Sequence, residues 1–223
     1  MERTCVPIPS NDKNAIMHLE IYAPENKNNL KGLIQICHGM TEYMGRYADF
    51  AQFFTSHGYI IFGNDIISHG RSITTKSSCL YLSNWNDTVR DMITAREYVS
   101  NKYPELPIYL LGFSLGSFIV RTNADLSPYK KEILVGTGNQ SAILMKAMRK
   151  VISKRYAKQM SFASDKIYDL LFGTYEKKFK DKPENYWLLT DDAKRAEYTK
   201  DRFVCQDLSP SFFCEFSKGM EYA

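Results

Sequence analysis

The amino-acid sequence predicts an α/β fold, with a doubly wound, mainly parallel sheet and a helical cap. Between residues 15 and 136, short apolar runs alternate five times with helical segments, which is the signature of parallel strands joined by helices. After Gly138 no run rich in Val and Ile follows, and residues 141–223 are amphipathic and rich in aromatic side chains. We therefore expect residues 1–139 to form the sheet-bearing core and residues 140–223 to form a cap over the mouth of the sheet.

The first part of the chain contains three expected strands and one helix. Residues 15–23 alternate between apolar and polar side chains, as in a half-exposed strand. Residues 33–37 are almost continuously apolar, which is typical of a strand buried on both faces. Residues 46–56 have helical spacing and end before a glycine stop at Gly58, and residues 59–62 form the third strand.

The middle of the chain continues the same alternation. Residues 66–83 are rich in Ser and Thr and predict an irregular loop, whereas residues 85–103 have the spacing of a helix with a packed face. Prolines at 104 and 107 separate this helix from the next strand. A further short strand is expected at residues 132–136.

Residues 107–120 carry the strongest chemical signal in the sequence. An apolar strand leads into the turn Gly112-Phe113-Ser114-Leu115-Gly116, and a helix follows. A turn of this kind holds its serine in a strained backbone conformation with the hydroxyl exposed. A Cβ at Gly112 or Gly116 would collide with the neighbouring strand and helix. Ser114 is therefore the candidate nucleophile.

A serine nucleophile needs donors for the oxyanion that forms when it attacks a carbonyl group. The backbone N–H of Leu115 is one candidate, because it lies at the start of a helix, where N–H groups are unpaired and the dipole favours negative charge. The backbone N–H of Met40 is the other, and His38 and Gly39 form the turn before it. Both loops follow the carboxyl ends of strands, where open α/β sheets bind ligands.

Several motifs together resemble the serine aminopeptidase S33 group of the α/β-hydrolase superfamily, which includes monoacylglycerol lipases and lysophospholipase-like enzymes. Ser68 stands where that family commonly has Gly, and Phe113 stands where His is commoner. The segments that carry the resemblance are His38-Gly39-Met40-Thr41-Glu42 with Arg46-Tyr47, Asp65 to Ser72, Gly112 to Gly116, Gly136-Thr137-Gly138, and Phe172-Gly173 with Trp187-Leu188 and Asp191-Asp192.

The resemblance implies an activity and a site. Ser114 would be the nucleophile, Met40 and Leu115 would supply the oxyanion N–H groups, and the cap would line an acyl or aromatic pocket. The implied substrate is a small carboxylic ester of the monoacylglycerol or lysophospholipid type. No cofactor or metal is implied, and lipid contact would be transient and made through the cap.

The histidines depart from the family pattern. In α/β-hydrolases the triad runs in the order Ser, acid, His, but all four histidines, His18, His38, His57 and His69, precede Ser114. We expect the chain to be truncated before the strands that carry the triad acid and base. Of the upstream histidines only His69 is a candidate substitute, since His38 is expected to be structural. The acids Asp125, Asp165, Asp191 and Asp192 are expected on the surface or in the cap.

Three hypotheses stay open at this point: a serine hydrolase that lacks its C-terminal part, a catalytically inactive binding protein derived from a hydrolase, and one half of a split enzyme. Other classes are disfavoured. The net charge of +4, without a basic stripe, argues against nucleic acid, and no run approaches the ~18 apolar residues of a membrane span. Five cysteines without metal-ligand spacing predict reduced thiols in a cytoplasmic protein.

Overall fold

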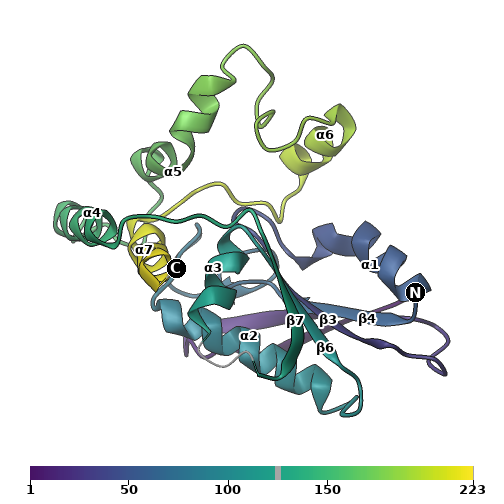
Figure 1. Cartoon of the computed structure of the whole chain (residues 1–223). Coiled ribbons are helices and arrows are strands. Elements are labelled where there is room, and N and C mark those ends of the chain that lie inside the picture. Colours follow the sequence, from purple (N-terminus) through teal and green to yellow (C-terminus); the bar gives the residue numbers. More distant parts are fainter. Residues whose placement is uncertain (124–126, 223) are drawn as a thin grey trace.

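The computed structural model describes residues 1–123 and 127–222, which are built around one mixed sheet (Figure 1). The strand order is β1-β2-β4-β3-β6-β7, and the short strand β5 pairs with β2. β3, β4, β6 and β7 are parallel, whereas β1 and β2 run antiparallel to their neighbours. The strands are β1 (Glu2–Pro9), β2 (Ala15–Ala23), β3 (Gly32–Cys37), β4 (Tyr59–Asn64), β5 (Ile73–Thr74), β6 (Ile108–Phe113) and β7 (Tyr129–Val135).

Helices cover both faces of this sheet. On one face α1 packs against β2 and β4, and its Ala51 joins a small core with Ile34, Ile36 and Ile61. On the other face α2 and α3 cover the larger core. Successive side chains of a strand point to opposite faces, so strands such as β3 serve both cores. The helices are η1 (Met44–Tyr47), α1 (Ala48–Ser56), α2 (Trp85–Ser100), α3 (Leu115–Thr122), α4 (Ala142–Arg155), α5 (Asp165–Lys178), α6 (Asp192–Lys200) and α7 (Pro210–Tyr222).

The predicted fold class is confirmed, with differences in individual elements. β1 was not predicted, because most of its residues are exposed and two prolines, Pro7 and Pro9, interrupt its pattern; it is held by antiparallel pairing with β2. The helix predicted at residues 85–103 ends at Ser100. The helix predicted at residues 46–56 is split into η1 and α1.

The last helix, α7, packs into the main core. Phe212 and Phe213 are fully buried, and α7 contacts α2, α3 and α4. The backbone N–H of Trp85, at the start of α2, donates a hydrogen bond to the Glu215 carboxylate at 2.8 Å. The expected cap of residues 140–223 therefore contributes to the main core: Met145 and Ile152 of α4 and Ile167 of α5 join the same cluster as α7, although α5 and α6 stand apart from the sheet (Figure 1). The division at residues 139 and 140 stays a prediction.

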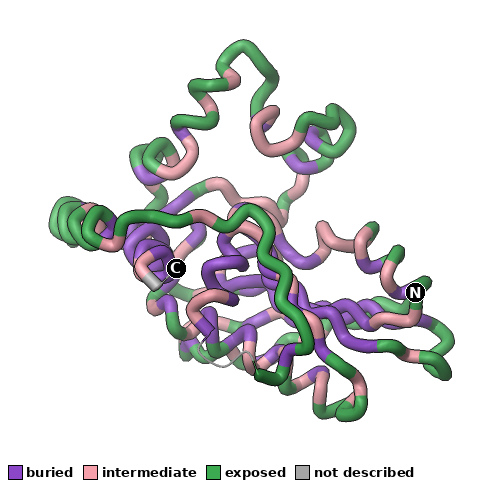
Figure 2. Tube along the Cα trace, viewed as in Figure 1, coloured by how far each residue is buried: buried purple, intermediate pink, exposed green. Residues whose placement is uncertain are grey.

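The sheet ends at β7, whose outer edge pairs with no strand among the described residues. Ile133 is 51% exposed, Leu134 41% and Val135 44%, and Figure 2 shows this strand as a continuous exposed stretch. Unpaired N–H and C=O groups together with apolar side chains make such an edge prone to association.

Candidate active site

Ser114 lies at the sharp turn from β6 into α3, where the sequence predicts it. Its φ of 47° and ψ of −112° fall in a region that non-glycine residues rarely occupy. A Cβ built on Gly116 would lie 2.0 Å from the Cys37 carbonyl oxygen, and one built on Gly112 would lie 2.9 Å from the Gly116 oxygen. Both glycines are therefore required by close backbone approach, as expected.

The same packing brings the loop that contains Met40 against this turn. β3 and β6 are adjacent and parallel, with Cys37 opposite Gly112, so the residues that follow each strand meet at one end of the sheet. Gly116 also packs against the start of this loop, because a Cβ built on Gly116 would lie 2.7 Å from the His38 carbonyl oxygen. The structure thus places the two predicted N–H groups on loops that touch.

Neither of these two N–H groups donates a hydrogen bond to any described part of the chain. The Leu115 N–H belongs to the first residue of α3, where no intrahelical acceptor is available. The Met40 N–H lies in the loop after β3 and is likewise unpaired within residues 1–123 and 127–222. The Ser114 hydroxyl makes no hydrogen bond there either. These groups are therefore free to bind a ligand.

His38 orients the peptide group that carries the Met40 N–H. The His38 side chain is fully buried, its Nε2 accepts a hydrogen bond from the Ile66 N–H at 2.8 Å, and its Nδ1 lies 2.7 Å from the Gly39 carbonyl oxygen. Because Nε2 accepts, the proton is on Nδ1 and is donated to Gly39. In a trans peptide the C=O and N–H groups point in opposite directions, so this bond directs the Met40 N–H away from the imidazole. Both ring nitrogens of His38 are thus bonded to backbone groups, and its structural role stays a prediction.

Two carboxylates, the half-buried Glu42 and the buried Asp65, hold the loops in place. Glu42 accepts hydrogen bonds from the Gly39 N–H and from the Tyr47 hydroxyl, the latter at 2.8 Å. Asp65 accepts from the N–H groups of Met44 and Arg71, both at 2.8 Å, and so ties the loop after β3 to the loop after β4. Burial raises the pKa of Glu42 and raises the pKa of Asp65 to about 6. Neither role was predicted from the sequence, although Asp65 directly follows a buried strand and so carried an available signal, whereas Glu42 carries none.

The remaining histidines do not reach Ser114. His69 is buried 5.3 Å from the His38 ring, measured between centroids, with its Nδ1 3.1 Å from the Ile67 carbonyl oxygen. Burial lowers the pKa of His69 to about 4, and burial together with His69 lowers the pKa of His38 to about 3. His57 is exposed at the end of α1, and His18 lies 3.7 Å from the Glu20 carboxylate. No hydrogen bond joins the Ser114 hydroxyl to a histidine in the part of the chain that the structure describes.

Three of the four acids that are not expected to serve as the triad acid lie at or near the start of α5 and α6. Asp191 caps α6 by accepting a hydrogen bond from the Lys194 N–H at 2.9 Å, and Asp192 pairs with Arg195. Asp165 begins α5. Asp125 lies outside the described residues. None of the three described acids is hydrogen-bonded to a histidine, so none forms a triad pair.

One group among the described residues has the donor atoms for a metal ion. The donor atoms of Cys5, His18 and Glu20 lie within 4.8 Å of one another on β1 and β2. Arg3 already binds the Glu20 carboxylate at 2.6 Å, and Arg71 lies 3.8 Å from it. Two guanidinium groups at these distances oppose a further cation, so the geometry favours an ion-pair cluster.

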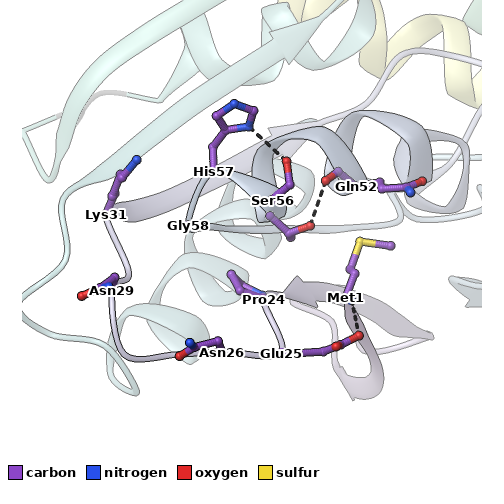
Figure 3. Close-up of a pocket in the computed structure, with 11 residues that line it drawn as sticks. Met1, Pro24, Glu25, Asn26, Asn29, Lys31, Gln52, Ser56, His57 and Gly58 are labelled. Atoms are coloured by element: carbon purple, nitrogen blue, oxygen red, sulfur yellow. Dashed lines mark hydrogen bonds and ion pairs between the residues drawn. The ribbon is translucent and has the colours of Figure 1, made fainter.

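A cavity in the described structure lies away from Ser114. It has a volume of about 990 Å³ and is lined by residues that precede β3 and β4, such as Lys31, His57 and Gly58, together with Met1 and Glu25 (Figure 3). These residues are at the amino ends of parallel strands, whereas Ser114 follows the carboxyl end of β6.

Among the described helices, none is both long and apolar enough to cross a membrane.

Comparison with solved structures identifies the fold as that of the α/β hydrolases. The crystal structure of a thermostable carboxyl esterase from Bacillus coagulans, in complex with glycerol, superposes with a TM-score of 0.83 at 23% identity, covering 99% of this chain and 73% of that one. The model of the serine aminopeptidase S33 family matches residues 28–223. The chain therefore belongs to that family.

Curated relatives match over a shorter segment. A monoglyceride lipase homolog of monkeypox virus is 36% identical over 89 residues, which are 40% of this chain and 31% of the relative. The monoglyceride lipase of Rattus norvegicus is 35% identical over 89 residues, 40% of this chain and 28% of the enzyme. The matched segment thus spans less than a third of each relative.

Proposed function

We propose that this chain carries the nucleophile and oxyanion donors of a serine hydrolase that acts on small carboxylic esters of the monoacylglycerol or lysophospholipid type. The observation that carries the proposal is Ser114, held at positive φ, with the unpaired N–H of Leu115 next to it in the chain and the unpaired N–H of Met40 on the adjoining loop. The matches to lipases and to an esterase support ester substrates.

The proposed reaction proceeds through an acyl-enzyme. Ser114 Oγ bonds to the ester carbonyl carbon while a base takes its proton, and the carbonyl oxygen becomes an oxyanion that the N–H groups of Met40 and Leu115 stabilise. Collapse expels the alcohol, which takes up the proton, and water then releases the carboxylic acid from Ser114. Losing one such donor typically costs about 10²–10³ in rate.

The base is the part that the described residues do not supply. The imidazoles of His38 and His69 are buried and bonded to backbone carbonyl oxygens, and their lowered pKa values make them weak bases. A general base contributes about 10²–10⁴ in rate. This observation favours, as a second candidate, a binding protein that keeps the ester pocket without turnover; a partner chain that supplies the base is the third.

Chemical rescue tests the proposal. The 223-residue chain is treated with a fluorophosphonate, with and without added imidazole, and the adduct is located by mass spectrometry. We expect slow labelling at Ser114 that imidazole accelerates, and none at that position in Ser114→Ala. Absence of a Ser114 adduct in both conditions would favour the binding protein, and fast labelling without imidazole would refute the absence of a base.

A further inference from the structure

Met40 lies between two peptide groups that different parts of the chain hold. The peptide before it is fixed by His38, as described above. The carbonyl oxygen of the peptide after it accepts a hydrogen bond from the Thr41 hydroxyl at 2.6 Å. The Thr41 hydroxyl in turn accepts from the hydroxyl of Tyr198, in α6, at 2.7 Å, and the Thr41 carbonyl oxygen lies 3.1 Å from the same Tyr198 hydroxyl.

The backbone of Thr41 needs this support. Its φ is 60°, in the left-handed region, which is unfavourable for a β-branched residue. Such conformations cost of order 1–3 kcal/mol and persist only where surrounding contacts enforce them. Two successive hydrogen bonds, from the Tyr198 hydroxyl to the Thr41 hydroxyl and from there to the Met40 carbonyl oxygen, act directly on the Met40–Thr41 peptide.

Tyr198 is itself held firmly. Its side chain is 2% exposed, and the Arg46 guanidinium lies 4.8 Å from the centre of its ring. A second contact lies beside it, because the Tyr43 hydroxyl donates a hydrogen bond to Asp201 at 2.7 Å. Burial raises the pKa of Tyr198 to about 12, so its hydroxyl keeps the proton that it donates.

We propose that Tyr198 is a positioning residue for the Met40 N–H, an inference that rests on the proposed role of that group as an oxyanion donor. Tyr198 fixes the Met40–Thr41 peptide through Thr41, and His38 fixes the Gly39–Met40 peptide. The Met40 N–H therefore keeps its direction only when both sets of hydrogen bonds are intact. Since Tyr198 belongs to α6, the position of that helix sets the geometry of the site.

Two substitutions that each remove a hydroxyl group test this assignment. Tyr198→Phe removes the hydroxyl that donates to Thr41, and Thr41→Val removes the hydroxyl that accepts this hydrogen bond, whereas Thr41→Ser keeps it. Tyr175→Phe is the matched control, because the Tyr175 side chain is 52% exposed and its hydroxyl makes no hydrogen bond with the described residues. Backbone amide signals of the ¹⁵N-labelled chain are compared in each variant.

We expect the Met40 and Thr41 amide signals to shift or broaden in Tyr198→Phe and to stay at the parent positions in Tyr175→Phe. Because a substitution at position 41 moves the signal of that residue by itself, the two variants there are compared at Met40, whose signal should move more in Thr41→Val than in Thr41→Ser. Signals that do not move in Tyr198→Phe would overturn the assignment, whether or not Ser114 proves reactive. Labelling of Ser114 by the fluorophosphonate, with imidazole present, should slow about tenfold in Tyr198→Phe, less than for complete loss of a donor.

The two proposals fail separately. If the parent chain forms no Ser114 adduct, the proposed function is wrong, and the amide signals alone decide whether Tyr198 positions the loop. If the adduct forms at the same rate in the parent and in Tyr198→Phe, the tyrosine has no part in aiming the donor.

Discussion

Replacing Gly116 with alanine is expected to destabilise the protein through steric overlap with backbone. A Cβ at this position would lie 2.0 Å from the Cys37 carbonyl oxygen, 2.5 Å from the Cys37 carbonyl carbon and 2.7 Å from the His38 carbonyl oxygen. None of these atoms belongs to a flexible side chain, so β3 and α3 must separate. Overpacking of this kind costs up to about 3 kcal/mol, and the better helix propensity of alanine offsets about 1 kcal/mol.

The net loss is therefore about 2 kcal/mol in the free energy of unfolding, which lowers the melting temperature of a chain of this size by about 4–8 °C. Urea titration followed by tryptophan fluorescence measures this loss, since Trp85, at the start of α2, is buried against Phe216 of α7. Gly138→Ala is the matched control, because its Cβ would lie 3.5 Å from the nearest atom of Phe118. A Gly116→Ala protein as stable as Gly138→Ala would refute the steric argument.

Three further outcomes are expected. Phe212→Ala should cost about 3–5 kcal/mol in urea titration, because the ring is fully buried; a loss under about 1 kcal/mol would contradict the packing of α7 in the core. Ile133→Lys should reduce concentration-dependent light scattering with little change in stability, because this side chain is 51% exposed on the sheet edge; unchanged scattering would argue against β7 as the associating surface. The pKa of His38 is about 3 and that of His69 about 4 in the folded chain, so the unfolded chain binds more protons below pH 6.5 and stability falls as pH drops from there towards 4. Against the parent, His69→Phe should lose less stability over this interval, and equal slopes would exclude the contribution of His69.

The strands around Ser114 could be predicted because their signal is local. Residues 33–37 and 59–62 are apolar runs that need both faces covered, and they form β3 and β4. The turn at Ser114 is likewise contained in a few neighbouring residues. β1 was missed because an edge strand with exposed side chains carries no apolar pattern.

Contacts between distant segments were beyond sequence reasoning. Tyr198 and Thr41 are 157 positions apart, and nothing in either neighbourhood marks the hydrogen bond between them. The aromatic residues of α7 also look like those of the cap, although Phe212 and Phe213 pack in the core. Helical periodicity shows that a helix has an apolar face but does not show which layer receives it.

The edge strand β7 also sets how tightly the backbone of Ser114 is held. The Ser114 N–H donates a hydrogen bond to the Val135 carbonyl oxygen at 2.8 Å, at the end of β7. Edge strands open by local fraying without global unfolding. Each fraying event at β7 therefore releases the Ser114 amide, and its hydrogen exchange follows the opening of the edge, while amides in β3, at the centre of the sheet, exchange only when the whole core opens.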